Sequence, residues 1–587
     1  MSALSKSIAD LKTNDRQWDA FSAEGHTVVL APPGSGKTKL LATRLASDLL
    51  NKISKPQGAA CITLTNAAAD ELRRRVESLG VESRANLFVG TVHGFALGKI
   101  IEPFAVVVGR PELAHISIAS KSQCDQAMRS AIAEVLRGED TRSAESTIKI
   151  NRQRLATDED WAKSGAKIRE VARRYEGLLH EQGLRDFPEL IAVAVEMVEK
   201  HETIRRMLVA QYPHIYVDEY QDLAPGLDRL VKALCFDYRV NADLFAVGDP
   251  DQAVFAWTGA RPELLHELAR RSEVQPAVEL EYNYRCGEEI IRIANLMRRG
   301  RPPIIGRQRH GGHVSATRCT GGLSDQYRHV VEQVRQAVFG GVLLHEIAVL
   351  APQRQQCEAV AGVLRESGFP AFFRGDAYRL TVVTGFIEAC AAWATAGRET
   401  SHYRLGDLLQ TWRTILGGRW TRKDDIALTE LLMDVTDRAD DAAVAFINEL
   451  LDCGLRRALG QVSLAEEALE VGRMGDALSS GELSGLTVRG LAERALKWDR
   501  VEVTTMTSSK GLEFDVVLLL AADEQSIPSY LSINDSLQLA EERRKFYVSI
   551  TRARKEVRIF YSGFVVTKFG RRIDVEPSRF LKEIGLV

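Results

Sequence analysis

The stretch that most constrains this chain begins at Val28 and reads VVLAPPGSGKTKLLATRLASDLL. The apolar residues Val28–Leu30 predict a short buried strand, a loop rich in Pro and Gly follows, and Lys37 opens a helix whose leucines recur every three or four residues. A strand, a glycine-rich loop and a helix in this order allow backbone N–H groups and a helix N-terminus to bind phosphate. The stretch therefore predicts a P-loop, in which Lys37 reaches the outer phosphates and Thr38 holds Mg²⁺.

A carboxylate pair further along the chain supports this nucleotide site. Asp218 and Glu219, in DEYQD, follow the apolar run at 214–217. Asp218 is expected to coordinate Mg²⁺ through water, and Glu219 to orient and deprotonate the attacking water. A glycine-rich turn before a surface helix is the alternative for the loop taken alone. The residues expected at the phosphates are Ala31, where Gly is usual, Pro32, Pro33, Gly34, Ser35, Gly36, Lys37, Thr38 and Lys39.

Composition limits the other classes of function. Lys and Arg total 77 against 79 Asp and Glu, so any nucleic-acid surface must be a local patch rather than a bulk charge. The eight cysteines include no CxxC pair, which argues against zinc, iron–sulfur clusters and a disulfide framework. The N-terminus has no apolar signal region and no run of 18 apolar residues occurs, so we expect a cytoplasmic protein without a membrane span.

The order of strand and helix signals predicts an α/β fold interrupted twice by helical segments. Residues 1–105 and 186–296 are expected to form one α/β domain around an insertion at 106–185, and residues 297–390 and 496–587 a second one around an insertion at 391–495. The break between them is the Arg-, Pro- and Gly-rich segment 297–312. The predicted strands are Val28–Leu30, Ala60–Thr65, Leu87–Thr91, His214–Val217, Leu244–Val247, Val278–Glu281, Glu346–Ala351, Val501–Met506, Val516–Ala521 and Val557–Tyr561. The predicted helices include Asp158–Gln182, Arg354–Ser367 and Asp424–Leu450.

DEYQD resembles the Walker B motif of UvrD/Rep/PcrA-like superfamily 1 helicases, and further segments are similar to that family's motifs in the family's order. These segments are Asn14–Phe21, Thr65–Leu72, Gly90–Phe95, Val247–Gln252, Phe255–Ala260, Tyr282–Arg285, Ser508–Phe514, Glu541–Arg544 through Tyr547, and Ile550–Ala553. Asp186–Leu190 resembles the stretch that closes the family's first insertion. The resemblance implies two RecA-like P-loop domains in tandem, with ATP and Mg²⁺ as cofactors bound in the cleft between them.

The resemblance also implies roles around the nucleotide. Gln17 would read the adenine edge, Tyr284 would stack on the base, and Glu513 would contact the ribose. Gln252 would sense the γ-phosphate and report hydrolysis to the DNA site.

Two arginines from different domains would act as arginine fingers. A planar guanidinium bonds two phosphate oxygens at once and offsets charge in the transition state, which suits Arg285 and Arg552 to that role. Three further arginines, Arg543, Arg544 and Arg554, are expected to be helix-surface or salt-bridge residues.

A track for single-stranded DNA follows from the same resemblance, because single strands are held by aromatic stacking and phosphate contacts. Phe255 and Trp257 would stack on bases, although their spacing also fits one face of a buried strand. Backbone phosphates would be bonded by Thr65, Asn66, Thr91 and His93; the alternative for His93 is a core histidine. Leu64, Thr258 and Thr507 depart from the family pattern on this side, which predicts a weaker or differently tuned grip on DNA.

The expected activity is an ATP-driven 3′→5′ DNA helicase or translocase acting on single-stranded or partly duplex DNA, in repair, recombination or anti-phage defence. We expect ATP turnover stimulated by single-stranded DNA, with modest unwinding by the isolated chain. The second insertion is shorter than in the housekeeping members, and compact members occur beside a separate nuclease, including Gabija-type systems. The alternative is therefore an ATP-gated DNA-sensing subunit of a nuclease-containing complex, with little unwinding of its own.

Overall fold

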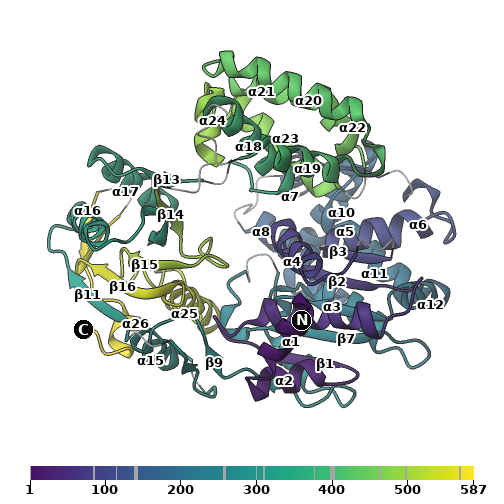
Figure 1. Ribbon diagram of the computed structural model, residues 1–587, viewed down its shortest axis with the longest axis horizontal. Coiled ribbons are helices and arrows are strands. Elements are labelled where there is room, and N and C mark those ends of the chain that lie inside the picture. Colours follow the sequence, from purple (N-terminus) through teal and green to yellow (C-terminus); the bar gives the residue numbers. More distant parts are fainter. Residues whose placement is uncertain are drawn as a thin grey trace.

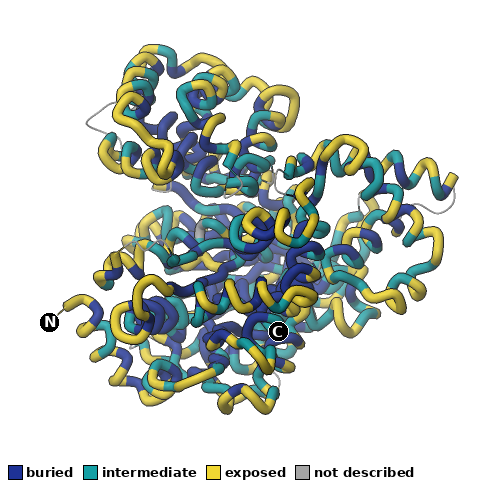
Figure 2. The backbone as a smooth tube through the Cα atoms, turned by 90° about the vertical axis from the view of Figure 1, so that its right-hand side faces the viewer, coloured by how far each residue is buried: buried dark blue, intermediate teal, exposed yellow. Residues whose placement is uncertain are grey.

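The computed structural model describes residues 2–82, 86–113, 116–137, 143–255, 259–298, 300–308, 311–375, 377–396, 403–461, 464–495, 499–567 and 570–587. Two α/β domains lie side by side, with a helical bundle above them (Figure 1). Buried residues fill the centre of each part, and exposed residues cover its outer helices and loops (Figure 2). None of the helices in the described ranges is long and apolar enough to cross a membrane.

The first domain is built on a six-stranded, all-parallel sheet in the order β3-β2-β6-β7-β1-β8. Successive side chains of a strand point to opposite faces, so both faces are apolar: Val28 faces one buried cluster and Val29 the other. Its strands are β1 (Thr27–Leu30), β2 (Ala59–Thr63), β3 (Leu87–Thr91), β6 (His214–Val217), β7 (Asp243–Gly248) and β8 (Val278–Glu279). Its helices are α1 (Ala3–Leu11), α2 (Asp15–Ser22), α3 (Lys37–Asn51), α4 (Asn66–Ser78), α5 (Val92–Phe95), α6 (Glu102–Phe104), α11 (Phe187–Lys200), α12 (Glu202–Gln211), α13 (Pro225–Cys235) and α14 (Glu263–Ala269).

The second domain repeats this plan with a parallel sheet in the order β11-β16-β15-β12-β14-β13. Helix α15 packs in the core of this sheet, so the second domain begins ahead of the boundary predicted at residue 297. Its strands are β11 (His313–Arg318), β12 (Ile347–Ala351), β13 (Ala371–Phe373), β14 (Val501–Thr505), β15 (Phe514–Leu519) and β16 (Ala553–Tyr561). Its helices are α15 (Glu288–Met297), α16 (Leu323–Phe339), α17 (Arg354–Glu366), α25 (Ser536–Ile550) and α26 (Arg579–Glu583).

Each domain carries a helical insertion with its own apolar core. The first insertion contains α7 (Lys121–Leu136), α8 (Ala144–Gln153), α9 (Asp158–Ser164) and α10 (Ala166–Glu181). The second forms the bundle of α18 (Val382–Ala396), α19 (Leu405–Leu416), α20 (Arg422–Val435), α21 (Ala443–Leu450), α22 (Arg456–Leu459), α23 (Ala465–Ser479) and α24 (Val488–Ala495). Because α18 belongs to this bundle, the insertion starts ahead of the predicted residue 391.

Two predicted helices are divided in the structure. Gly165 adopts φ 97° between α9 and α10, a left-handed conformation that ends a helix, so the helix predicted over 158–182 is two helices. The helix predicted over 424–450 is interrupted between Val435 and Ala443. The remaining short strands are β4 (Ser117–Ile118), β5 (Leu184–Arg185), β9 (Tyr282–Asn283), β10 (Ile305–Gly306), β17 (Phe564–Val566) and β18 (Arg572–Asp574).

Candidate nucleotide site and nucleic-acid track

The P-loop lies at the carboxyl end of β1, next to β7, where open parallel sheets bind ligands. Gly34 and Gly36 adopt φ 68° and 81°, and a Cβ on Gly34 would lie 2.7 Å from the Cβ of Arg285. These two positions therefore require glycine. Ala31 does not take a left-handed conformation, and its N–H donates to the Gly248 carbonyl at 2.9 Å. An alanine consequently fits where the motif usually has Gly.

The P-loop lysine meets the predicted catalytic carboxylates. Lys37 Nζ lies 2.5 Å from Glu219 Oε1, and Gln221 donates from Nε2 to the other oxygen of Glu219. Burial alone would raise the pKa of Glu219, but Lys37 and Lys510 outweigh it and hold that pKa below its usual range. Burial and the charge of Glu219 raise the pKa of Asp218 instead. The two neighbouring carboxylates therefore differ: Lys37 and Lys510 stabilise the ionised form of Glu219, whereas burial and the charge of Glu219 disfavour the ionised form of Asp218.

The backbone of Glu219 is held in an uncommon conformation. Its φ of 52° is left-handed, which costs a non-glycine residue about 1–3 kcal/mol. The Glu219 N–H donates to Asp218 Oδ1 at 3.0 Å, and the Asp218 N–H donates to the Ile62 carbonyl at 3.0 Å. Both contacts fix the direction in which the Glu219 carboxylate leaves β6.

Several polar groups beside the loop fit a magnesium–nucleotide complex. Ser35 Oγ is buried and has no hydrogen-bond partner within the described residues, so a phosphate oxygen would satisfy it. Thr38 lies in the first turn of α3, and Asp218 directly follows β6 on the same edge of the sheet. Lys39 is the exception, because it forms an ion pair with Asp10 of α1 rather than with a group of the P-loop.

The residues expected to contact the adenine base form hydrogen bonds with the P-loop backbone. Gln17 Nε2 donates to the Ser35 carbonyl at 2.7 Å, and the Tyr284 N–H donates to the Gly34 carbonyl at 2.8 Å. Asn14 Nδ2 donates to the Tyr284 hydroxyl at 2.9 Å and so links these two segments. The Tyr284 side chain is 42% exposed, which leaves ring surface for stacking.

Two arginines meet in the seam between the domains: Arg552, just before β16 of the second domain, and Arg285, in the segment between β9 and α15 that joins the two domains. Arg552 is buried and donates from Nη2 to Gln252 Oε1 at 3.3 Å. Burial and the neighbouring Arg285 lower its pKa to about 10. Arg285 forms an ion pair with Glu513 and donates to the Thr551 carbonyl at 3.4 Å. Glu513, expected at the ribose, thus contacts the other predicted finger in this structure.

Two basic residues in the seam were not predicted as site residues. Lys510, in the loop after β14, lies with Nζ 2.5 Å from Asp222 Oδ2, 2.7 Å from the Gln252 carbonyl oxygen and 4.0 Å from Glu219 Oε2. Arg544 of α25 donates from Nε to the Ala253 carbonyl at 2.6 Å, instead of the helix-surface or salt-bridge role expected for it. A lysine followed by a glycine in a loop was only a weak sequence signal for Lys510, and no sequence signal marked Arg544. Arg543 and Arg554 form the expected salt bridges, with Glu583 and with Glu346 and Asp515.

Three of the four predicted phosphate contacts of the DNA track are covered by the second insertion. Thr91 Oγ1 donates to Glu466 Oε2 at 2.9 Å, and His93 Nδ1 lies 2.7 Å from Glu466 Oε1. Burial acts against the charge of Glu466, but His93 and Thr91 outweigh it and hold the pKa below its usual range. Asn66 Nδ2 donates to Glu467 Oε1 at 2.8 Å. Two carboxylates of α23 therefore occupy donors that the sequence assigns to DNA phosphates.

The other residues of the track are placed differently. Thr65 caps α4, accepting a hydrogen bond from the Ala68 N–H at 3.2 Å. Phe255 is half-buried against the core of the second domain, with Lys510 Nζ 5.2 Å from its ring centre. Trp257 and Thr258 lie outside the described residues.

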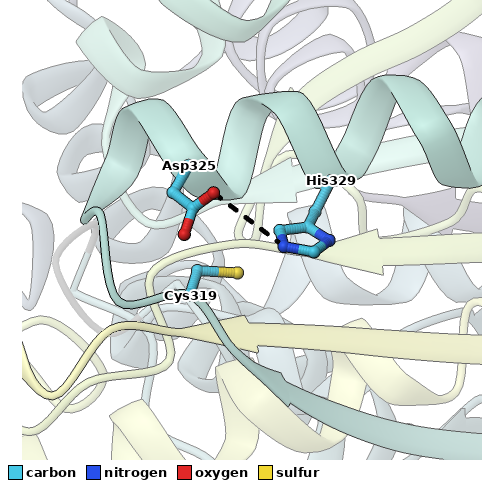
Figure 3. Close-up of side chains that lie close together, drawn as sticks. All are labelled: Cys319, Asp325 and His329. Carbon is cyan, nitrogen blue, oxygen red and sulfur yellow. Dashed lines mark ion pairs between the residues drawn. The ribbon is translucent and has the colours of Figure 1, made fainter.

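A separate cluster of potential metal ligands lies in the second domain, at the start of α16 (Figure 3). Cys319 Sγ, an Asp325 oxygen and a His329 nitrogen all lie within 4.8 Å of one another. The carboxylate is already bonded, because Arg328 donates to Oδ1 at 2.8 Å and the Gly321 N–H donates to Oδ2 at 3.1 Å. Burial, followed by the charges of nearby aspartates, raises the pKa of the Cys319 thiol to about 12. The Asp325 carboxylate thus bonds groups at the start of α16, and the thiol of Cys319 stays protonated, so the cluster does not have the chemistry of a metal site.

A P-loop in one parallel-sheet domain, reached across a seam by an arginine of a second parallel-sheet domain, is the arrangement of tandem RecA-like proteins, and this chain has that fold. Residues 13–273 match the UvrD/REP helicase N-terminal domain, and residues 480–563 match the UvrD-like helicase C-terminal domain, so the two matches cover more than half of the chain. The chain belongs to the UvrD-like helicase family.

Relatives align over nearly the whole chain. DNA helicase II of Escherichia coli (strain K12) is 25% identical, over 97% of this chain and 87% of that protein. The ATP-dependent DNA helicase Rep of the same strain is 25% identical, over 95% of this chain and 92% of that protein. The ATP-dependent DNA helicase PcrA of Staphylococcus epidermidis is 24% identical, over 100% of this chain and 87% of that protein.

Proposed function

We propose that this chain is an ATP-dependent DNA helicase that moves 3′→5′ along single-stranded DNA. The observation that carries the proposal is a continuous series of contacts across the seam. Lys37 pairs with Glu219, Lys510 lies beside Glu219 and bonds the Gln252 carbonyl, and Gln252 bonds Arg552. A nucleotide bound at Lys37 would therefore be sensed by residues of both domains, which is the requirement for coupling its hydrolysis to their relative movement.

The chemistry of the site follows from its charges. Thr38 and Asp218 would hold Mg²⁺, which neutralises phosphate charge when bound. Glu219, kept ionised by Lys37, would accept a proton from the attacking water, and its fixed backbone would orient that water. Arg552 and Arg285 would bind the transferring phosphate across the seam, once Arg285 exchanges Glu513 for phosphate.

The test is ATP turnover with and without single-stranded DNA, measured on the wild type and three variants. Lys37→Ala and Glu219→Gln should abolish turnover, and Arg552→Ala should lower it by about 10³-fold or more. Arg543→Ala is the matched control, because Arg543 pairs with Glu583 inside the second domain. Normal turnover in Arg552→Ala would remove the interdomain site from the proposal.

A second candidate is an ATP-gated DNA-sensing subunit that does not translocate and works with a nuclease partner. The observation favouring it is that Glu466 and Glu467 of the second insertion already contact Thr91, His93 and Asn66, which were expected to bind DNA. Displacement of streptavidin from end-biotinylated single strands distinguishes the two candidates. A 3′→5′ motor clears streptavidin from the 5′ end selectively, whereas a switch clears neither end. Co-purification with a nuclease would add support to the second candidate.

A further inference from the structure

One short segment of the first domain, Gln252–Phe255, is bound by the second domain. It follows β7 and joins the predicted γ-phosphate sensor Gln252 to the predicted base-stacking residue Phe255. Three cations from the second domain bond its first two residues. Lys510 Nζ bonds the Gln252 carbonyl at 2.7 Å, Arg544 Nε bonds the Ala253 carbonyl at 2.6 Å, and Arg552 Nη2 lies 3.3 Å from Gln252 Oε1.

Apolar contacts attach the rest of the segment to the same domain. Val254 is fully buried in the apolar cluster that contains Phe514 and Phe546 of the second domain, and Phe255 packs against this cluster. Gln252 also donates from Nε2 to Asp249 Oδ2 at 2.8 Å within the first domain. The segment therefore links the two domains, and movement at the seam changes its contacts with the second domain.

The bonds to the main chain are the informative part of this arrangement. Arg544 follows Arg543, whose side chain pairs with Glu583, and precedes the buried residues of α25. Its own side chain nevertheless donates to a main-chain carbonyl of the first domain. Burial lowers its pKa, so the side chain is desolvated at a net cost that a surface salt bridge would not incur. A main-chain acceptor also fixes the position of the backbone itself, which a side-chain partner would not do.

We propose that Arg544 and Lys510 are positioning residues that transmit closure of the seam to Phe255, and thereby couple nucleotide binding to the grip on DNA. The inference rests on the proposed function, and it adds two residues and a route to it. Both residues act on the backbone between Gln252 and Phe255, so neither needs to touch nucleotide or DNA. Because coupling between two ligands is reciprocal, each ligand must change the affinity of the other by the same factor.

The test measures that factor directly. The dissociation constant of labelled oligo(dT) is measured with and without magnesium–adenylyl-imidodiphosphate, and that of the nucleotide analogue with and without oligo(dT). In the wild type, we expect both measurements to give one factor, of about 5–150-fold. In Arg544→Ala the factor should fall below about twofold, while each ligand measured alone keeps its affinity within about threefold. Arg544→Lys, which keeps a cationic donor, should restore part of the factor.

Two controls make the result decisive. Arg543→Ala removes the same side chain one position earlier, and its coupling factor should stay at the wild-type value. In a double-mutant cycle with Phe255→Ala, loss of coupling should not add, because both variants interrupt one route. Wild-type coupling in Arg544→Ala, or equal loss in Arg543→Ala, would overturn the inference. If Arg544→Ala does not fold, Arg544→Gln is judged by the same two criteria.

The proposed function can fail in a way that this test recognises. A wild type that binds neither oligo(dT) nor the analogue would refute the function and the inference together. A wild type that binds both ligands without any coupling would leave the nucleotide and DNA sites standing and refute the inference alone.

Discussion

The contact of Glu466 with Thr91 and His93 leads to a quantitative prediction about DNA binding. If these two residues bond DNA phosphates, the Glu466 carboxylate and the DNA compete for them, and neutralising it should tighten binding. Glu466→Gln keeps the shape of the side chain and its acceptor oxygen but removes the charge, so it tests the electrostatic part of the competition.

The expected size follows from the geometry. A hydrogen bond to a charged group contributes about 1.5–3 kcal/mol when it is well buried. The side chains of Glu466 and His93 are 24% and 30% exposed, so solvent screening reduces this to about 1–1.4 kcal/mol. Every 1.4 kcal/mol corresponds to tenfold, so the dissociation constant for single-stranded DNA should fall about fivefold to tenfold.

The assay is fluorescence anisotropy of labelled oligo(dT), at neutral pH and at two salt concentrations. Asp476→Asn is the matched control, because Asp476 is an exposed carboxylate near the other end of the same helix and changes the net charge equally. Equal affinities in Glu466→Gln and Asp476→Asn would refute the competition and leave the Glu466 contact as domain packing alone.

The remaining predictions concern the loop, the first insertion and the stacking residue. Gly34→Ala should abolish nucleotide binding in an equilibrium titration, since its φ is 68° and its Cβ would meet Arg285, whereas Ala31→Gly should bind normally. Asp186→Asn should lower the free energy of unfolding, measured in urea, by about 1–3 kcal/mol, because it removes one of the two carboxylates that pair with the buried Arg152 and leaves only Glu176. Arg152 outweighs burial and holds the pKa of Asp186 low, so this stabilisation is present above the ordinary aspartate pKa of about 3.9 and is lost as the pH falls through the lower folded value. Phe255→Ala should weaken oligo(dT) binding by about 1–3 kcal/mol, read by the same anisotropy titration, and an unchanged affinity would assign Phe255 to packing.

The amino-acid sequence determined the local parts of this protein. The P-loop was predictable because its strand, loop and helix are contiguous, and their apolar spacing and glycines act over a few residues. The strand β6 begins and ends where the sequence placed it, because a strand buried on both faces is a nearly continuous apolar run. The edge strand β3 also has the predicted bounds, although it is only partly buried. The division of 158–182 at Gly165 was missed, because one glycine within a long charged helical pattern does not by itself predict a helix end.

Only the tertiary structure decided which distant groups meet. Lys510 and Gln252 are 258 residues apart, Arg544 and Ala253 are 291 apart, and Thr91 and Glu466 are 375 apart. No local pattern marks such partners, because the sequence around a helical arginine does not differ according to whether its side chain faces water, a carboxylate or a carbonyl of another domain. The choice is made when two sheets and an insertion dock, since a buried charge must then take whichever acceptor the packing brings within reach.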